Sequence, residues 1–332
     1  MSHPSPVRPL GALARNAPFV SHDPEFAAVL GDAPRLVRVV ETDAHEGPVY
    51  VSGEDALYFT TLPRRGSDGP VVAIKRVALD GLRFPIEPER VSVVRPNTAA
   101  ANGMALDHAG ALVVCEQGSH SAHARISRID LAGGSHETLA VEWRGRKLNS
   151  PNDVVVAGDG SIWFTAPSYG FLQGFRPEPE VGDHVYRFDP RLGRLEVVAD
   201  TFDKPNGIAF SPDEQVLYVT DSGANQEEGS YYEERPHLVR AFDVVEGRYL
   251  VGERIFAHVS PGFPDGLKCD SDGRVYASCA SGVQVFDENG LLLGEIALAG
   301  AVNFTFGGPE RDVLFITTDD AIWAAVLDAK GA

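Results

Sequence analysis

Cysteine is scarce in this sequence, and positive charge is outweighed by negative charge. The three cysteines, Cys115, Cys269 and Cys279, are odd in number and form no CxxC pair. This pattern indicates neither a disulfide framework nor a zinc site, and we expect buried, apolar thiols. The 29 Lys and Arg residues face 47 Asp and Glu residues, for a net charge of −18. Because like charges repel, we expect neither nucleic acid nor an anionic membrane surface as a partner.

Long apolar runs and several familiar catalytic motifs are also missing. No apolar run in the sequence approaches the ~20 residues that cross a bilayer. The first 30 residues carry no secretion signal, so we predict a cytoplasmic location. The sequence contains no G-x-S-x-G, no HExxH and no Gly-rich phosphate loop. These absences argue against a serine hydrolase, a zinc protease of that type and a nucleotide-binding protein.

What the sequence does contain is a repeated unit: a polar residue, an apolar strand, a Gly-rich turn and a second apolar strand. The clearest copy is SPNDVVVAGDGSIWFT, residues 150–165. The second strands are near copies of one another, LYFT, LVVC, IWFT, LYVT, VYAS and LFIT. We call the six polar residues that begin the units the openers; they are Glu46, Asn102, Asn152, Asn206, Asp265 and Asn303. With loops added, each unit has about the length of a four-stranded propeller blade, ~40–50 residues. The sequence therefore predicts an all-β fold, a six-bladed β-propeller of four-stranded antiparallel blades.

The two ends of the chain bear on how this ring closes. The last unit ends too near residue 332 to supply its own fourth strand. The segment Arg35–Glu41, RLVRVVE, precedes the first opener and belongs to no unit. We predict that it completes the sixth blade and closes the ring, which removes exposed strand edges. The propeller domain would then span residues 35–332, and residues 1–34 would form an N-terminal arm that packs on the outside or frays.

The openers are the candidate site. Equivalent positions of the inner strands face the central channel of a propeller, so these six side chains are expected to converge. They comprise two carboxylates and four amides, with no Cys or His. An all-oxygen set suits Ca²⁺ or another hard cation such as Mg²⁺ or Mn²⁺. The alternative is that Asn and Asp merely begin strands as turn residues.

Two long loops are expected to cover the openers. They span residues 166–182 and 221–236, and their aromatic residues are Tyr169, Phe171, Phe175, Tyr231 and Tyr232. Polar groups beneath aromatic loops are typical of a small-molecule pocket with a lid. The same aromatics could instead anchor ordinary surface loops. His120 and His123, in the loop of the second unit, either reach the substrate or lie in solvent.

Several motifs resemble, in order, those of the senescence marker protein/gluconolactonase/luciferin-regenerating enzyme-like family of calcium-dependent sugar lactonases. They are HEGPVY, LNSPNDVVVAGDGSIWFTAPSYG, KPNGIAFSPDEQVLYVTDS and FPDGLKCDSDGRVYAS, and the resemblance covers residues 46–327. It implies that Glu46, Asn206 and Asp265 bind the divalent cation and that Asn152 contacts metal-side solvent or substrate. It also implies that Asp265 is the catalytic base. We include Asn152 in the expected metal set.

The sequence departs from the family pattern at two places on the pocket face. Ala166 stands where many bacterial members have Asp, and CEQG is followed by SHSAHAR where they often have CEHG and arginines. The identity of the substrate therefore cannot be carried over from the family.

The leading hypothesis is a lactone hydrolase that depends on Ca²⁺ or another divalent cation such as Mg²⁺, Mn²⁺ or Zn²⁺. The expected substrate is a small sugar lactone such as gluconolactone. Asp265 would take the proton of the attacking water, and Asn102, Asn152, Tyr169 and Asn303 would contact the substrate. The alternatives are a calcium-dependent organophosphate hydrolase and a non-catalytic binding scaffold with a structural metal. A monomer and a homodimer are both compatible with the sequence.

Overall fold

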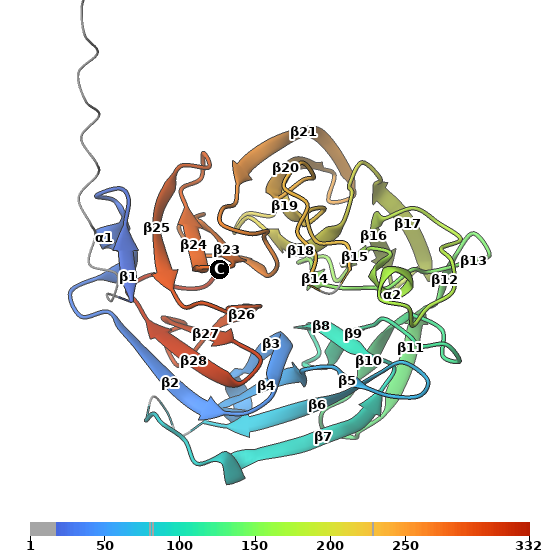
Figure 1. The fold of residues 1–332 in the computed structure, drawn as a ribbon, viewed down its shortest axis with the longest axis horizontal. Helices are drawn as coiled ribbons and strands as arrows, with labels where there is room; N and C mark the ends of the chain where they lie inside the picture. Colours follow the sequence, from blue (N-terminus) through green and yellow to red (C-terminus); the bar gives the residue numbers. More distant parts are fainter. Residues whose placement is uncertain (1–17, 80, 82, 228) are drawn as a thin grey trace, which may run out of the picture.

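The computed structural model describes residues 18–79, 81, 83–227 and 229–332. Its sheets are arranged as six blades around a central axis (Figure 1), and each blade contains four antiparallel strands. The predicted all-β, six-bladed propeller is therefore confirmed. Among the described residues, no helix has the length and apolar character needed to cross a membrane.

Residues 44–199 contain the first three blades. Blade one contains β3 (Ala44–Val51), β4 (Ala56–Thr61), β6 (Pro70–Ala78) and β7 (Val91–Thr98), with the short β5 (Arg64–Arg65) beside β6. Blade two contains β8 (Ala101–Leu106), β9 (Leu112–Glu116), β10 (Arg125–Ile129) and β11 (His136–Ala140). Blade three contains β14 (Val154–Val156), β15 (Ile162–Ala166), β16 (His184–Asp189) and β17 (Arg194–Ala199). The small hairpin of β12 (Glu142–Trp143) and β13 (Arg146–Lys147) lies between blades two and three in the chain.

The other three blades complete the circle. Blade four contains β18 (Pro205–Phe210), β19 (Val216–Asp221), β20 (Leu238–Val245) and β21 (Tyr249–His258). Blade five contains β22 (Leu267–Cys269), β23 (Val275–Cys279), β24 (Gly282–Phe286) and β25 (Leu292–Ala297). Blade six contains β26 (Phe304–Gly307), β27 (Val313–Thr317), β28 (Ala321–Val326) and β2 (Arg35–Glu41). Short 3₁₀ helices span Ser52–Glu54 and Pro88–Arg90, and α2 spans Tyr169–Leu172.

The ring closes as predicted, because β2 pairs with β28 and supplies the outer strand of blade six. The register runs antiparallel from Arg35 opposite Val326 to Glu41 opposite Ala321. This pairing satisfies backbone groups that would otherwise form an open edge on the last blade. The N-terminal and C-terminal parts of the chain are thereby joined in one sheet.

The apolar core lies between neighbouring blades. Ile126 of blade two, for example, packs in one buried cluster with Phe164 and Tyr186 of blade three. Each sheet thus buries both faces against its neighbours, which explains why the second strands are apolar throughout. The three cysteines are buried and unpaired, as expected.

The N-terminal arm contains structure that the sequence analysis did not predict. Strand β1 (Phe19–Ser21) pairs with β25 as a fifth strand of blade five, and helix α1 (Phe26–Leu30) follows it. Phe26 is completely buried and lies against Gly294, where a Cβ atom would be only 2.3 Å from the Phe26 ring. Residues 18–34 therefore pack on the outside of the ring. Residues 1–17 of the predicted arm lie outside the described residues.

Candidate active site

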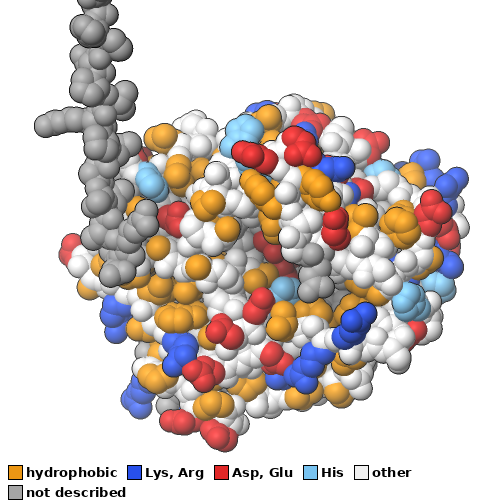
Figure 2. Space-filling view, in the orientation of Figure 1, with side chains coloured by type: hydrophobic (Ala, Val, Ile, Leu, Met, Phe, Trp, Pro, Cys, Tyr) orange, Lys and Arg blue, Asp and Glu red, His pale blue; other side chains and the backbone are white. Residues whose placement is uncertain are grey.

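The six openers meet at one end of the central channel, at or directly before the inner strands. Glu46, Asn102 and Asn206 belong to β3, β8 and β18, whereas Asn152, Asp265 and Asn303 lie one or two positions before β14, β22 and β26. Five of the six are buried, with 9% or less of the residue exposed, and Asp265 is partly exposed. Figure 2 shows a hollow at the centre of the ring, with acidic side chains on its walls.

Glycines that follow the openers allow neighbouring inner strands to approach closely. A Cβ atom on Gly103 would lie 2.5 Å from the Asn152 carbonyl oxygen, and one on Gly207 would lie 2.3 Å from the Asp265 carbonyl oxygen. Such contacts are impossible for a side chain without moving the backbone. The glycine after an opener is therefore a packing requirement that brings the next opener inward.

The Thr or Ser that ends the second-strand motif in five of the six units also holds neighbouring blades together. Its Oγ donates a hydrogen bond to a backbone carbonyl at or next to the opener of the following blade. The pairs are Thr60 with Asn102, Thr165 with Asn206, Thr220 with Asp265, Ser278 with Val302, and Thr317 with His45. In blade two this position is Cys115, which has no hydroxyl to donate. The repeated LYFT-like motif thus encodes links between blades as well as strand structure.

Glu46 is a buried carboxylate in contact with other site residues. The Asn303 Nδ2 group donates to Glu46 Oε2 at 2.7 Å, and the Gly47 N–H donates to the same oxygen at 3.1 Å. Burial and the nearby carboxylates of Asp265 and Asp153 raise the pKa of Glu46 to about 8. The hydrogen bond from Asn303 acts in the opposite direction but does not offset burial.

The pKa of Asp265 is raised as well. Burial and then the charge of Asp153 raise the pKa of Asp265 to about 7, while the neighbouring Asn206 amide lowers it. Asp153 raises the pKa of both Glu46 and Asp265, and Asp265 raises that of Glu46 as well, so a cation bound among these carboxylates would be favoured. A pKa shift of this size in a channel is also typical of functional sites.

Asp153 is the site residue that sequence reasoning missed. It is buried, its Oδ1 accepts the Val154 N–H at 2.9 Å, and its Oδ2 accepts the Ile208 N–H at 3.4 Å. The Lys268 ammonium lies 3.9 Å from Oδ2. A signal was present in the sequence, because the residue after an opener is glycine in four of the six units but aspartate in unit three.

The amide openers have unused acceptor atoms. The Oδ1 atoms of Asn102 and Asn152 are buried and have no hydrogen-bond partner among the described residues. Buried oxygens without a partner cost free energy unless a ligand satisfies them. Across the part of the chain that the structure describes, no group of three or more His, Cys, Asp and Glu residues has the geometry of a metal site. The openers contribute only two such residues, so a cation here would depend on amide oxygens, which calcium accepts readily.

The long loop of blade three contains two buried aromatic residues, one of them near the openers. Tyr169 begins α2 and is 4% exposed, and Phe175 is also buried. Burial and then the nearby Asp265 carboxylate raise the pKa of Tyr169 well above its usual value. Phe171 and Tyr231 are exposed, so the predicted lid aromatics do not act as one group.

The histidines of the blade-two loop lie at the surface. His120 and His123 are exposed. The backbone N–H of His120 donates to the Asp68 carbonyl at 2.9 Å. The Asp68 carboxylate accepts the hydroxyls of Ser119 and Ser121 at 2.6 and 2.5 Å. Blade one therefore holds the loop that carries these histidines.

Fold and site together define a six-bladed propeller whose channel mouth is lined by carboxylate and amide oxygens. Residues 44–320 match the family described as SMP-30/Gluconolactonase/LRE-like region. The chain belongs to this family, which confirms the resemblance inferred from the motifs.

Individual relatives are similar over most of the chain. Lactonohydrolase oryL of Aspergillus oryzae is 28% identical, over 94% of this chain and 74% of that protein. The gluconolactonase of Zymomonas mobilis is 27% identical, over 82% of this chain and 75% of that protein. The structure of a gluconolactonase from Xanthomonas campestris superimposes with a TM-score of 0.78 at 34% identity, covering 97% of this chain and 99% of that one.

Proposed function

We propose that this protein hydrolyses a lactone, with a sugar lactone such as gluconolactone as the substrate class, and that it uses a divalent cation. Relatives named lactonohydrolase and gluconolactonase support the reaction type. The observation that carries the proposal is the convergence of Glu46 and Asp265, both with raised pKa values, beside unpaired amide oxygens of Asn102 and Asn152.

The residues present fit a hard cation. Glu46, Asn152, Asn206 and Asp265 would hold it, and an all-oxygen set of carboxylates and amides favours Ca²⁺ over softer metals. When bound, the cation would supply Lewis-acid polarisation of the lactone carbonyl. Bound positive charge would also relieve the repulsion between the two carboxylates.

Of the two carboxylates, Asp265 is the better candidate for the catalytic base. It is partly exposed, so water can reach it, whereas Glu46 is 3% exposed and accepts the Asn303 amide. The oxygen of the water would attack the carbonyl carbon while its proton passes to Asp265. The ring carbon–oxygen bond then breaks and the ring oxygen takes that proton, which gives a hydroxy acid that ionises in solution.

The remaining openers would orient the substrate. The free Oδ1 atoms of Asn102 and Asn152 can accept hydrogen bonds from sugar hydroxyls or from the attacking water. Tyr169, in the loop above them, would form one wall of the pocket. The substrate contact predicted for Asn303 stays a prediction, and its bond to Glu46 supports a further role in orienting that carboxylate. A cytoplasmic location and the oligomeric state also remain predictions.

A proton-release assay tests the proposal. Aldonolactones and phosphotriesters are offered separately with Ca²⁺, with chelator, and with Ca²⁺ restored in excess of chelator. Lactone hydrolysis that is lost with chelator and returns with Ca²⁺ is the expected result. Hydrolysis of phosphotriesters alone would favour the hypothesis of an organophosphate hydrolase. Hydrolysis of neither class would favour the hypothesis of a non-catalytic binding scaffold.

A further inference from the structure

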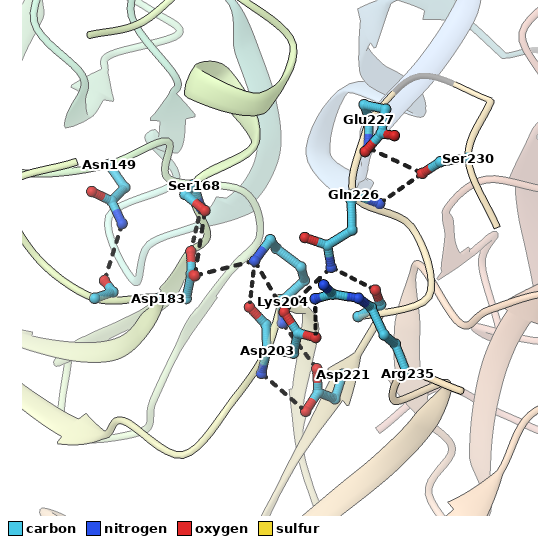
Figure 3. Close-up of polar contacts among 12 residues, drawn as sticks. Asn149, Ser168, Asp183, Asp203, Lys204, Asp221, Gln226, Glu227, Ser230 and Arg235 are labelled. Atoms are coloured by element: carbon cyan, nitrogen blue, oxygen red, sulfur yellow. Dashed lines mark hydrogen bonds and ion pairs between the residues drawn. The ribbon is translucent and has the colours of Figure 1, made fainter. Parts of the chain in front are cut away.

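Lys204 is a buried lysine between the loops of blades three and four. Figure 3 shows its side chain reaching between Asp183 and Asp203. The Nζ atom lies 3.2 Å from Asp183 Oδ2, 3.1 Å from Asp203 Oδ1 and 2.8 Å from the Asp203 carbonyl oxygen. An ammonium group has three N–H donors, and these three contacts account for all of them. The side chain is only 6% exposed.

Asp183 connects Lys204 to the segment that carries Tyr169. Asp183 Oδ1 accepts the backbone N–H of Ser168, and Oδ2 lies 3.3 Å from the Ser168 hydroxyl. Ser168 directly precedes Tyr169, the first residue of α2. Asp183 therefore helps to position the start of α2, and with it the buried Tyr169.

Asp203 connects the same lysine to the loop of blade four. Its Oδ1 accepts the Gln226 amide at 3.3 Å, and its Oδ2 accepts the Arg235 guanidinium at 3.0 Å. Burial alone would raise the pKa of Asp203, but Lys204 and these donors bring the pKa below its usual value. Lys204 is thus the shared partner of the two loops, as the dashed contacts of Figure 3 show.

The backbone of Lys204 is tied to the site as well. Its N–H donates to Asp221 Oδ1 at 2.9 Å, and its carbonyl accepts the Ser222 N–H at 2.9 Å. Asn206, a proposed cation ligand, follows two residues later. One residue therefore connects both loops above the channel to the inner strand below them.

We propose that Lys204 is a positioning residue for the substrate, which holds Tyr169 and the blade-four loop over the openers. This inference rests on the proposed lactone hydrolysis. Without the ammonium, the partly buried carboxylates of Asp183 and Asp203 would lose the positive charge between them, and their repulsion would move the loops apart. The cation site would be less affected, because β18 pairs with β19 on both sides of Asn206, at Pro205 and at Ile208.

The test compares K204M with R187M, a matched control. Arg187 has the same 6% side-chain exposure and pairs with Asp159, at the hairpin turn of blade three. For K204M we expect the KM for an aldonolactone to rise at least tenfold while kcat and calcium affinity change less than threefold. Hydrogen–deuterium exchange should become at least tenfold faster in residues 168–173 and 222–235. For R187M both segments should exchange as in the wild type.

A second variant covers the case in which K204M does not fold. D183A removes both the carboxylate and the acceptor of the Ser168 N–H, so residues 168–173 should exchange faster while residues 222–235 stay protected by Asp203. KM and exchange rates in K204M within twofold of R187M would overturn the proposal, as would unchanged exchange in D183A. A wild type that hydrolyses no lactone would instead refute the proposed function, while the exchange data would still decide the coupling of the loops.

Discussion

Asn303 and Glu46, which are 257 positions apart in the chain, are joined by a 2.7 Å hydrogen bond from the amide nitrogen to the carboxylate. The bond connects blade six to blade one at the point where the ring closes. It stabilises the charged form of a carboxylate whose burial raises its pKa to about 8. The amide therefore lowers the cost of holding Glu46 ionised at neutral pH.

We first predict that Asn303→Asp destabilises the metal-free protein. The change replaces the donor to Glu46 by another carboxylate, so the protein should need the cation more. The melting temperature should fall in chelator and recover largely when Ca²⁺ is added. Asn303→Ala, which removes the donor without adding charge, should show a smaller gain from Ca²⁺. Equal effects of Ca²⁺ on the two variants would contradict the prediction.

The second prediction concerns the pH dependence of stability without metal. Glu46 and Asp265 have folded pKa values of about 8 and about 7, above the ~4.3 and ~3.9 of unfolded chains. The folded state then holds more protons than the unfolded state, so their contribution to stability is fully present at low pH and is lost as the pH rises from ~4 to ~8. Burial lowers the pKa of His45, but Asp319 and Glu46 outweigh burial and raise it above its usual value. His45 therefore acts in the same direction.

Melting temperatures between pH 5 and 9 check this prediction. The metal-free protein should melt at progressively lower temperature as the pH rises. Saturating Ca²⁺ should flatten the profile, because bound positive charge replaces the protons. In Glu46→Gln, which removes one of the titrating groups, the metal-free profile should also be flatter than in the wild type. A metal-free profile that rises across this range would be inconsistent with the raised pKa values.

The third prediction is that Asp265→Asn lowers kcat for lactone hydrolysis by roughly 10²- to 10⁴-fold, the range typical of a lost general base. Calcium binding should persist, because an amide oxygen remains at the ligand position. The measurements are proton release with a saturating lactone and calorimetric titration with Ca²⁺. Asp107→Asn is a suitable control, since Asp107 pairs with Arg128 outside the openers. Turnover at the wild-type rate in Asp265→Asn would exclude Asp265 as the base.

The fourth prediction concerns the links between blades. The Thr165 Oγ1 donates to the Asn206 carbonyl at 2.7 Å and accepts the Asp153 N–H at 3.1 Å. Thr165→Val keeps the shape but leaves both buried groups unpaired, so the free energy of unfolding should fall by about 1–3 kcal/mol. Denaturant unfolding measures the loss. Thr138→Val on the exposed part of β11 should change it by less than about 0.5 kcal/mol, and an equally small loss in Thr165→Val would contradict the assignment.

Much of the fold was readable from the sequence because its determinants are local and repeated. Strand alternation, Gly-rich turns and the spacing of the openers predicted the six blades, and the unassigned segment Arg35–Glu41 predicted the closing strand. Helix α1 and strand β1 were not found, because they have no counterpart in the repeat. Their position depends on packing Phe26 against Gly294 of blade five.

The sequence by itself also determined which side chains reach the channel, since equivalent positions of a closed ring must face its axis. Only the tertiary structure decided which of them touch, in which direction the pKa values of Glu46 and Asp265 shift, and that Asp153 and Lys204 lie beside the site. The physical reason is that the partners of each residue come from different blades. Burial, charge and hydrogen bonding at the channel are properties of the assembled ring and have no signature within any one unit.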